Sequence, residues 1–248
     1  MSGPTSGGGG GGARPAPSID PESLPSWSRA SSETLESAAR EARPLVIYFP
    51  SENAADSEFS DKGLADLSKT DAVFVKIPYT ADREKSPWAE ESVVPTSKLL
   101  SDNPSRDYNV PVGKLTVIVA DSYGNEYYRM TKAPGTDQLK GYLKKVKDQA
   151  DKTSEKLQKN LDKANEYLTN NDRKNALKLL LKNFKEGVVG LQAQEDSIRA
   201  YHNILDAART EMAELVEKRD AEGLKALAKD MDKTDMEKEI DEALAELK

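Results

Sequence analysis

Short runs of consecutive apolar residues, separated by polar and turn-forming stretches, mark the first half of the chain. Leu45–Phe49 and residues 72–77 are two such runs, and β-branched and aromatic side chains dominate both. Runs of this length and composition are typical of strands buried on both faces of a sheet. Between them, residues 56–68 place apolar side chains at helical spacing. We therefore expect a parallel strand–helix–strand unit with a right-handed crossover.

A second group of strands is predicted further along the chain. Residues 114–120 form another apolar run, and residues 121–125 follow as a turn in which Gly124 suits a positive φ. Glu126–Met130 then returns as an antiparallel strand. One helix is expected before these strands in the sequence and one after them. The first begins at Ser32 and is stopped by Pro44, and the second begins at Thr136.

Strand signals end after residue 147, and Lys, Glu, Asp, Leu and Ala dominate the rest of the chain. Apolar residues recur there at helical spacing over residues 157–168, 172–184 and 198–216. Short turns between such helices favour an antiparallel bundle or helical hairpins. The sequence therefore predicts a leader, an α/β domain and an α-helical domain, over residues 1–25, 26–147 and 148–248.

Composition narrows the classes of function that the chain can have. Its 248 residues contain no cysteine and a single histidine, His202, which excludes disulfides, thiol catalysis and metal sites built from Cys or clustered His. The net charge of −7 leaves no basic excess to neutralise phosphates, which argues against nucleic-acid binding. No apolar run is long enough for a transmembrane segment. The acidic clusters lack the pattern of a calcium loop, so neither a metal nor a cofactor is expected.

The leader is rich in Gly, Pro and Ser and contains a glycine run at residues 7–12. Such a run acts as a flexible tether and cannot fold alone. It is either a disordered tail or cloning remnant, or the spacer that follows a removed export signal. Exported bacterial lipoproteins often carry such a spacer. The alternatives for localisation are therefore an exported or lipid-anchored protein of the cell envelope and a cytoplasmic protein.

The order of the predicted elements and three local motifs resemble the thioredoxin-like superfamily over about half of the chain. RPLVIYF at residues 43–49 is similar to the segment that leads into the redox motif of that family. YNV at residues 108–110 is similar to the aromatic-x-Val sequence before its conserved-proline loop. The strand that ends at Asp121, followed by Gly124, is similar to its strand-and-turn ending. The resemblance implies a thioredoxin-like mixed sheet flanked by helices, and the predicted all-α helical bundle follows it.

The residues that carry redox chemistry in that family have no counterparts here. The positions that match the active-site cysteines fall on or near Ala54 and Ser57. The position that matches the loop proline falls at residues 113–115, and Pro111 stands earlier in the sequence. Because thiol exchange needs a thiolate, the resemblance implies a redox-inactive member of the superfamily.

We therefore expect a non-enzymatic protein-binding or scaffold protein. Thioredoxin-like folds bind extended peptides beside the active site, so this groove would hold a protein or peptide partner. The helical domain would supply a second contact surface or a surface for self-association. The Pro-rich residues 80–109 either cover a sheet edge or form a partner-binding loop. The residues expected to line the groove are Phe49, Asn53, Ala54, Ser57, Trp88, Val110 and Lys114.

Several alternatives stay open. Residues 53–57 suit the start of the next helix, with Asn53 or Asp56 as its N-cap. A thiol-independent enzyme such as a hydrolase is a second class of function, although Ser57 has no His or Lys base nearby in the sequence. A structural subunit of a larger assembly is a third. In the helical domain, residues 164–184 are similar to one tetratricopeptide hairpin, and a generic antiparallel helical appendage is the alternative.

Overall fold

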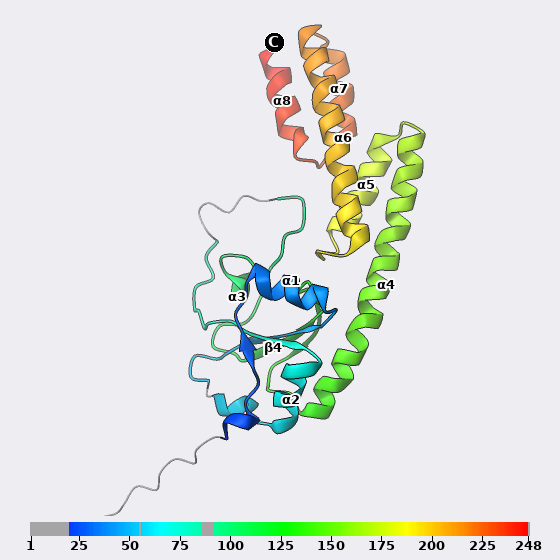
Figure 1. The fold of residues 1–248 in the computed structure, drawn as a ribbon. Coiled ribbons are helices and arrows are strands. Elements are labelled where there is room, and N and C mark those ends of the chain that lie inside the picture. Colours follow the sequence, from blue (N-terminus) through cyan, green and yellow to red (C-terminus); the bar gives the residue numbers. More distant parts are fainter. Residues whose placement is uncertain (1–19, 55, 86–91, 248) are drawn as a thin grey trace, which may run out of the picture.

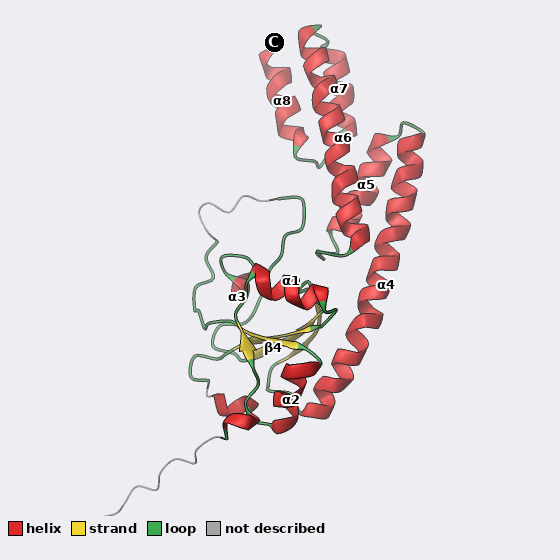
Figure 2. Ribbon diagram, viewed as in Figure 1, coloured by secondary structure: helices red, strands yellow, loops and turns green. Residues whose placement is uncertain are grey.

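The computed structural model describes residues 20–54, 56–85 and 92–247, and the side chains of residues 56 and 57 lie outside this description. Figure 1 shows a β-sheet with helices on both faces, from which further helices extend to the C-terminus. The predicted fold class is confirmed, since a mixed sheet with flanking helices is followed by an all-α part (Figure 2). Most of the expected leader lies outside the described residues.

The sheet has five strands in the order β1-β3-β2-β4-β5. Strand β3 pairs in parallel with β1 and β2, β4 is antiparallel to β2, and β5 is antiparallel to β4. Every residue of the central strands β2 and β4 is buried, as their continuous apolar runs predict. The sequence did not predict β1, because a strand of two residues is too short to show a period. The bounds are Trp27–Ser28 (β1), Leu45–Phe49 (β2), Val73–Lys76 (β3), Thr116–Ala120 (β4) and Glu126–Met130 (β5).

Helices cover the two faces of the sheet in different ways. Ala38 of α1 packs on the face that Leu45 and Ile47 of β2 share. Helix α2 and the first part of α4 pack on the other face, against side chains such as Tyr48. This division follows the alternation of side chains along a strand. The helices and 3₁₀ turns of this part are Pro21–Ser23 (η1), Ser32–Arg40 (α1), Asp56–Phe59 (η2), Lys62–Thr70 (α2) and Pro104–Asp107 (α3).

Helix α2 begins later than the sequence predicted. A 3₁₀ turn, η2, occupies the start of the expected helix, and the N-cap is Asp61 rather than Asn53 or Asp56. The Asp61 carboxylate accepts a hydrogen bond from the Leu64 N–H at 3.0 Å and another from the Thr136 hydroxyl at 2.6 Å. Because Thr136 opens α4, this contact with a distant residue fixes where α2 starts.

The C-terminal part is a set of packed helices that begins with one long helix. Helix α4 packs on the sheet near Leu139 and on the helical core near Leu161, so the boundary predicted at residue 147 lies inside it. Within the described part of the chain, no helix is both long and apolar enough to cross a membrane. The helices are Thr136–Thr169 (α4), Arg173–Phe184 (α5), Gln192–Glu217 (α6), Ala221–Asp230 (α7) and Met236–Glu246 (α8).

A buried amide fixes α5 between its neighbours α4 and α6. Asn183 of α5 is fully buried and donates to the Leu157 carbonyl at 3.0 Å and to the Ser197 hydroxyl at 2.9 Å. Its side-chain carbonyl accepts from the Asn160 amide at 2.8 Å. Since buried polar groups are costly without partners, this network restricts the rotation of α5 about its axis.

Candidate functional site

The segment after β2, which the sequence analysis compared with a redox motif, is occupied by polar and small residues. Asn53 is exposed, and Ala54 is half-buried against the cluster on one face of the sheet. The backbone of Ser57 lies in η2, and its side chain lies outside the described residues, as does the whole of Trp88. The structure therefore informs only part of the predicted partner groove.

Phe49, Val110 and Lys114 are the predicted groove residues that the structure brings together. They line a cavity of about 10 Å³, which has room for about one water molecule. Phe49 and Val110 are buried and Lys114 is exposed. Asn53 and Ala54 do not line this cavity. A partner groove at this position stays a prediction, and a bound segment would have to open it.

Arg83 also lines this small cavity, and sequence analysis did not single it out. Its guanidinium donates to the backbone carbonyls of Thr80 at 2.9 Å, Asp82 at 2.7 Å and Val110 at 3.1 Å. These bonds tie the Pro-rich stretch to the loop before β4. No sequence signal could have identified the contact, because every residue type supplies a backbone carbonyl.

The turn between β4 and β5 holds a buried carboxylate. Asp121 accepts hydrogen bonds from the N–H groups of Tyr123 at 2.9 Å and Asn125 at 3.0 Å. It also accepts from the Asn125 side-chain amide at 2.8 Å and from the Tyr127 hydroxyl at 3.3 Å. Burial raises the pKa of Asp121 above its ordinary value, and these donors oppose the shift. Raised carboxyl pKa values occur in catalytic acids. The four donors named here, however, all belong to the β4–β5 hairpin, so the contacts of Asp121 stabilise that hairpin.

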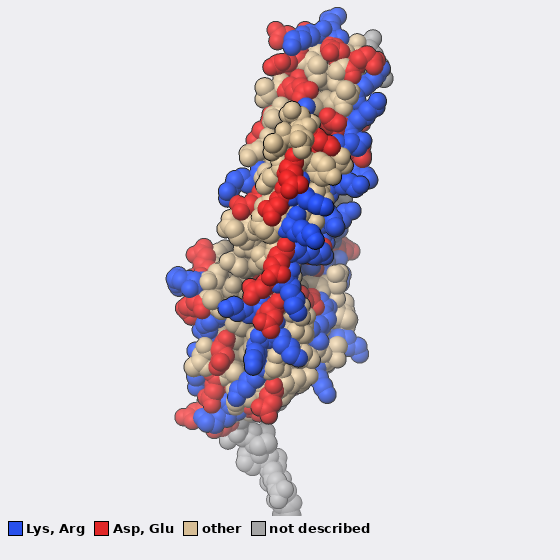
Figure 3. All heavy atoms as spheres, turned by 90° about the vertical axis from the view of Figure 1, so that its right-hand side faces the viewer, with Lys and Arg blue, Asp and Glu red and all other residues tan. Residues whose placement is uncertain are grey.

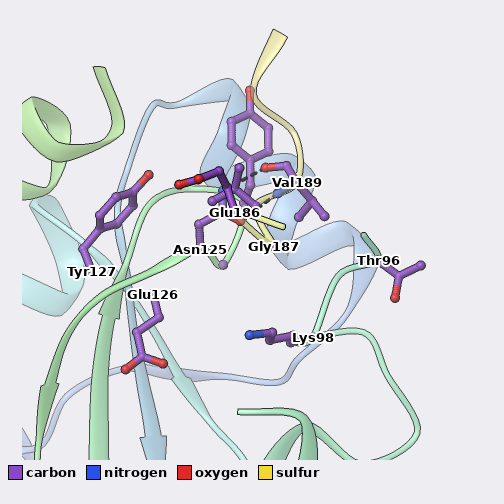
Figure 4. A pocket seen from close by; sticks show the side chains of 11 residues that line it. Thr96, Lys98, Asn125, Glu126, Tyr127, Glu186, Gly187 and Val189 are labelled. Atoms are coloured by element: carbon purple, nitrogen blue, oxygen red, sulfur yellow. Dashed lines mark hydrogen bonds between the residues drawn. The ribbon is translucent and has the colours of Figure 1, made fainter. Parts of the chain in front are cut away.

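Asn125 connects this hairpin to the helical half. Its amide donates to the Val189 carbonyl at 2.8 Å, and its side-chain carbonyl accepts from the Val189 N–H at 2.8 Å (Figure 4). Asp121 orients the amide, because it accepts from the same NH₂ group. Gly190 follows with a φ of 75°, and a Cβ there would lie 2.2 Å from the Tyr123 ring. We call the hydrogen bonds among Asp121, Asn125 and Val189 the Asn125 clamp.

Two hollows lie at the junction of the two halves. The hairpin pocket, drawn in Figure 4, has a volume of about 320 Å³ and is lined by the β4–β5 hairpin, by Lys98 and by residues 186–189. The junction groove has a volume of about 770 Å³ and lies between the Pro-rich stretch and the end of α5. Thr96, Lys98 and Gly187 line both hollows, so the two are neighbours.

The junction groove combines apolar and cationic side chains. Its apolar members are Val93, Val94, Pro95 and Phe184, and its basic members include Lys98 and Arg106. Arg106 is paired with Asp102 at 2.6 Å and with Asp107 at 2.7 Å, which raises the pKa of its guanidinium further. The arrangement can bury an apolar side chain and donate hydrogen bonds to carbonyl or carboxylate oxygens.

No model of a protein family matches this chain, and no curated protein matches it. Among solved structures, a chain described as a DsbH oxidoreductase is similar, with 15% sequence identity and a TM-score of 0.36. The alignment covers 56% of this chain and 95% of that chain. The present chain has a five-stranded mixed sheet in the order β1-β3-β2-β4-β5 that is flanked by helices, and its sequence contains no cysteine.

Proposed function

We propose that this protein is a non-enzymatic scaffold that holds a segment of a partner protein in the junction groove. The observation that carries the proposal is a hollow of about 770 Å³ whose walls come from both halves of the chain. Pockets of several hundred cubic ångströms bind ligands in many proteins, and they occur preferentially where two structural units meet. The proposal places the binding surface at this junction, whereas the sequence predicted it at the position after β2.

The two halves are held in a fixed relation, which a preformed site requires. Helix α4 is continuous from the sheet to the helical core, so bending there would break helical hydrogen bonds. The Asn125 clamp is a second connection, formed by residues that are 64 positions apart in the sequence. A preorganised surface binds more tightly than a mobile one, because less conformational entropy is lost on association.

The chemistry of the groove suits a protein segment. Apolar anchors surrounded by polar side chains are typical of binding surfaces for proteins. The half-buried Val93 and Val94 offer apolar contact area, and the exposed Lys98 supplies a donor beside them. This pattern fits a peptide with apolar side chains and a backbone that needs hydrogen-bond donors.

A displayed library of random peptides, selected on the full chain, tests the proposal. We expect enriched peptides that lose binding to Thr96→Trp, because Thr96 is exposed and lines both hollows. Thr131→Trp is the matched control, since Thr131 is exposed and follows the far end of β5. Lys114→Trp blocks the competing position after β2.

The outcome separates the two positions. Peptides that bind the Lys114→Trp and Thr131→Trp variants but not the Thr96→Trp variant support the junction groove. If the peptides fail to bind only the Lys114→Trp variant, the binding surface is the position after β2. A selection with no enrichment over an unrelated protein would count against the scaffold proposal as a whole.

A further inference from the structure

Four lysines form a row along one side of α5 and its C-terminal cap, and none of them forms an ion pair with a described carboxylate. Lys174, Lys178, Lys182 and Lys185 recur every three or four residues, so they share a face of the helix. All four side chains are exposed. In the described part of the chain, no ion pair joins any of them to an acidic side chain, whereas the nearby Arg173 is paired with Glu211 at 2.6 Å. We call these four residues the lysine row.

The helix dipole does not explain the lysine row. Cations are favourable in the last turn of a helix, which accounts for Lys182 and Lys185 near the end of α5. Lys174 lies in the first turn, where the dipole is unfavourable for a positive charge. A solvated helix face usually mixes both signs of charge. Figure 3 shows such a mixed surface on the right-hand side of Figure 1, where blue and red side chains intermingle along the molecule.

The lysine row borders a hollow of about 720 Å³ that has an apolar floor. Val93, Leu181 and Phe184 form the apolar part of its lining. Asp230, Asp232 and Lys233, at the end of α7 and just after it, line the hollow as well. Five lysines therefore face this hollow against two aspartates, on a chain whose net charge is −7. The local charge is opposite in sign to that of the whole molecule.

We propose that this hollow binds an acidic amphipathic helix of the partner protein. Its apolar side chains would cover Val93 and Leu181, which are half-buried, and its carboxylates would lie along the lysine row. Glu or Asp side chains three and four residues apart on a helix match the spacing of the row. An apolar helix face lying in a groove, with charges at the rim, is a common mode of peptide recognition. The charge complementarity also raises the association rate.

A nucleic acid fits the hollow less well than an acidic peptide. The chain carries a net charge of −7, which opposes a long polyanion approaching along its surface. The floor is apolar and two aspartates line the hollow, which suits a ligand with separate apolar and acidic side chains.

The inference rests on the proposed function, because the hollow and the junction groove share Val93 and Phe184. One segment could therefore occupy both. The inference adds the chemistry of that segment and the residues that select it. It can fail while the proposed function stands, and the experiment must separate the two.

The probe is a fluorescein-labelled amphipathic peptide of about 20 residues, long enough to form a helix, with Leu on one face and Glu beside it. Its matched control carries Gln in place of every Glu. Fluorescence anisotropy measures binding to the full chain and to a variant with Lys→Gln at all four positions of the lysine row. A second variant removes the same charge from exposed positions of α4, at Lys144, Lys145, Lys147 and Lys152.

We expect the Gln peptide and the lysine-row variant each to weaken binding about tenfold, since a few exposed ion pairs together supply roughly that factor. The α4 variant should bind the acidic peptide as the unmodified chain does. Added salt should weaken the acidic peptide more than the Gln peptide. Equal binding by the two lysine variants would overturn the inference. The inference would also be overturned if a single-stranded RNA or anionic lipid vesicles bound more tightly than the acidic peptide and lost binding to the lysine-row variant.

Two further comparisons keep this inference separate from the proposed function. If Thr96→Trp abolishes binding of the selected library peptides and the lysine-row variant leaves it unchanged, the junction groove stands and the inference is wrong. If the acidic peptide depends on the lysine row and no peptide responds to Thr96→Trp, the inference stands and the junction groove is wrong.

Discussion

The substitution Asn125→Ala should loosen the connection between the two halves of the chain. Asn125 is 6% exposed and makes three side-chain hydrogen bonds of 2.8 Å, two with the Val189 backbone and one with Asp121. Each such bond contributes about 0.5–1.5 kcal/mol net, so removing all three costs about 1.5–4.5 kcal/mol. The alanine leaves the N–H and carbonyl of Val189 without these partners.

Hydrogen exchange followed by mass spectrometry measures the effect where it arises. The Val189 N–H is bonded to Asn125, so peptides that cover residues 187–190 should exchange at least about tenfold faster in the variant, which is the rate ratio for about 1.4 kcal/mol. Urea unfolding followed by circular dichroism should show a lower midpoint. The matched control is Asn203→Ala, since Asn203 is an exposed residue of α6.

The control should leave both measurements unchanged. If Asn125→Ala also leaves the exchange of residues 187–190 and the urea midpoint unchanged, the clamp does not hold the halves together. Helix α4 would then be the connection that holds the junction groove in a preformed shape.

Two other substitutions test the same junction. Gly190→Ala should destabilise the chain more than Gly187→Ala in urea unfolding, because both residues have positive φ but only the Cβ at Gly190 meets the Tyr123 ring. The left-handed conformation costs about 1–2 kcal/mol at either position, and an equal loss in the two variants would contradict the steric argument. Because burial raises the folded-state pKa of Asp121, the protonated carboxyl contributes stability below its unfolded pKa, and this contribution is lost as the pH rises through the folded pKa. The difference in unfolding free energy between the unmodified chain and Asp121→Asn should therefore fall as the pH rises above about 4, and a flat difference would show that the folded pKa is not raised.

The sequence was a good guide to the bounds of two of the strands. The predicted bounds of β2 and β5 agree with the structure, because burial on both faces or a hairpin partner defines their ends locally. The start of α2 could not be predicted in the same way. Asp61 caps it while also accepting from Thr136, and that contact exists only once α4 packs against α2.

The candidate site was mostly hidden from the sequence. Asp121, Gly124 and Asn125 indicate a turn, but nothing in them shows that the Asn125 amide pairs with Val189, 64 residues further on. The lysine row is visible as a spacing in the sequence, yet only the packing of Phe184 beside it distinguishes it from an ordinary solvated helix face. The position after β2 was singled out by resemblance, and the bond from the Arg83 guanidinium to the Val110 carbonyl there could not be read from the sequence.

Mapping the binding surface of a library-selected peptide on the full chain by hydrogen exchange tests the central claim most directly. The account predicts slower exchange in residues 92–98 and 184–189 when the peptide is bound, since these segments line the junction groove and the hairpin pocket. Protection confined to residues 49–54 and 110–114 would contradict it, because binding would then occur at the position after β2 and not at the junction groove.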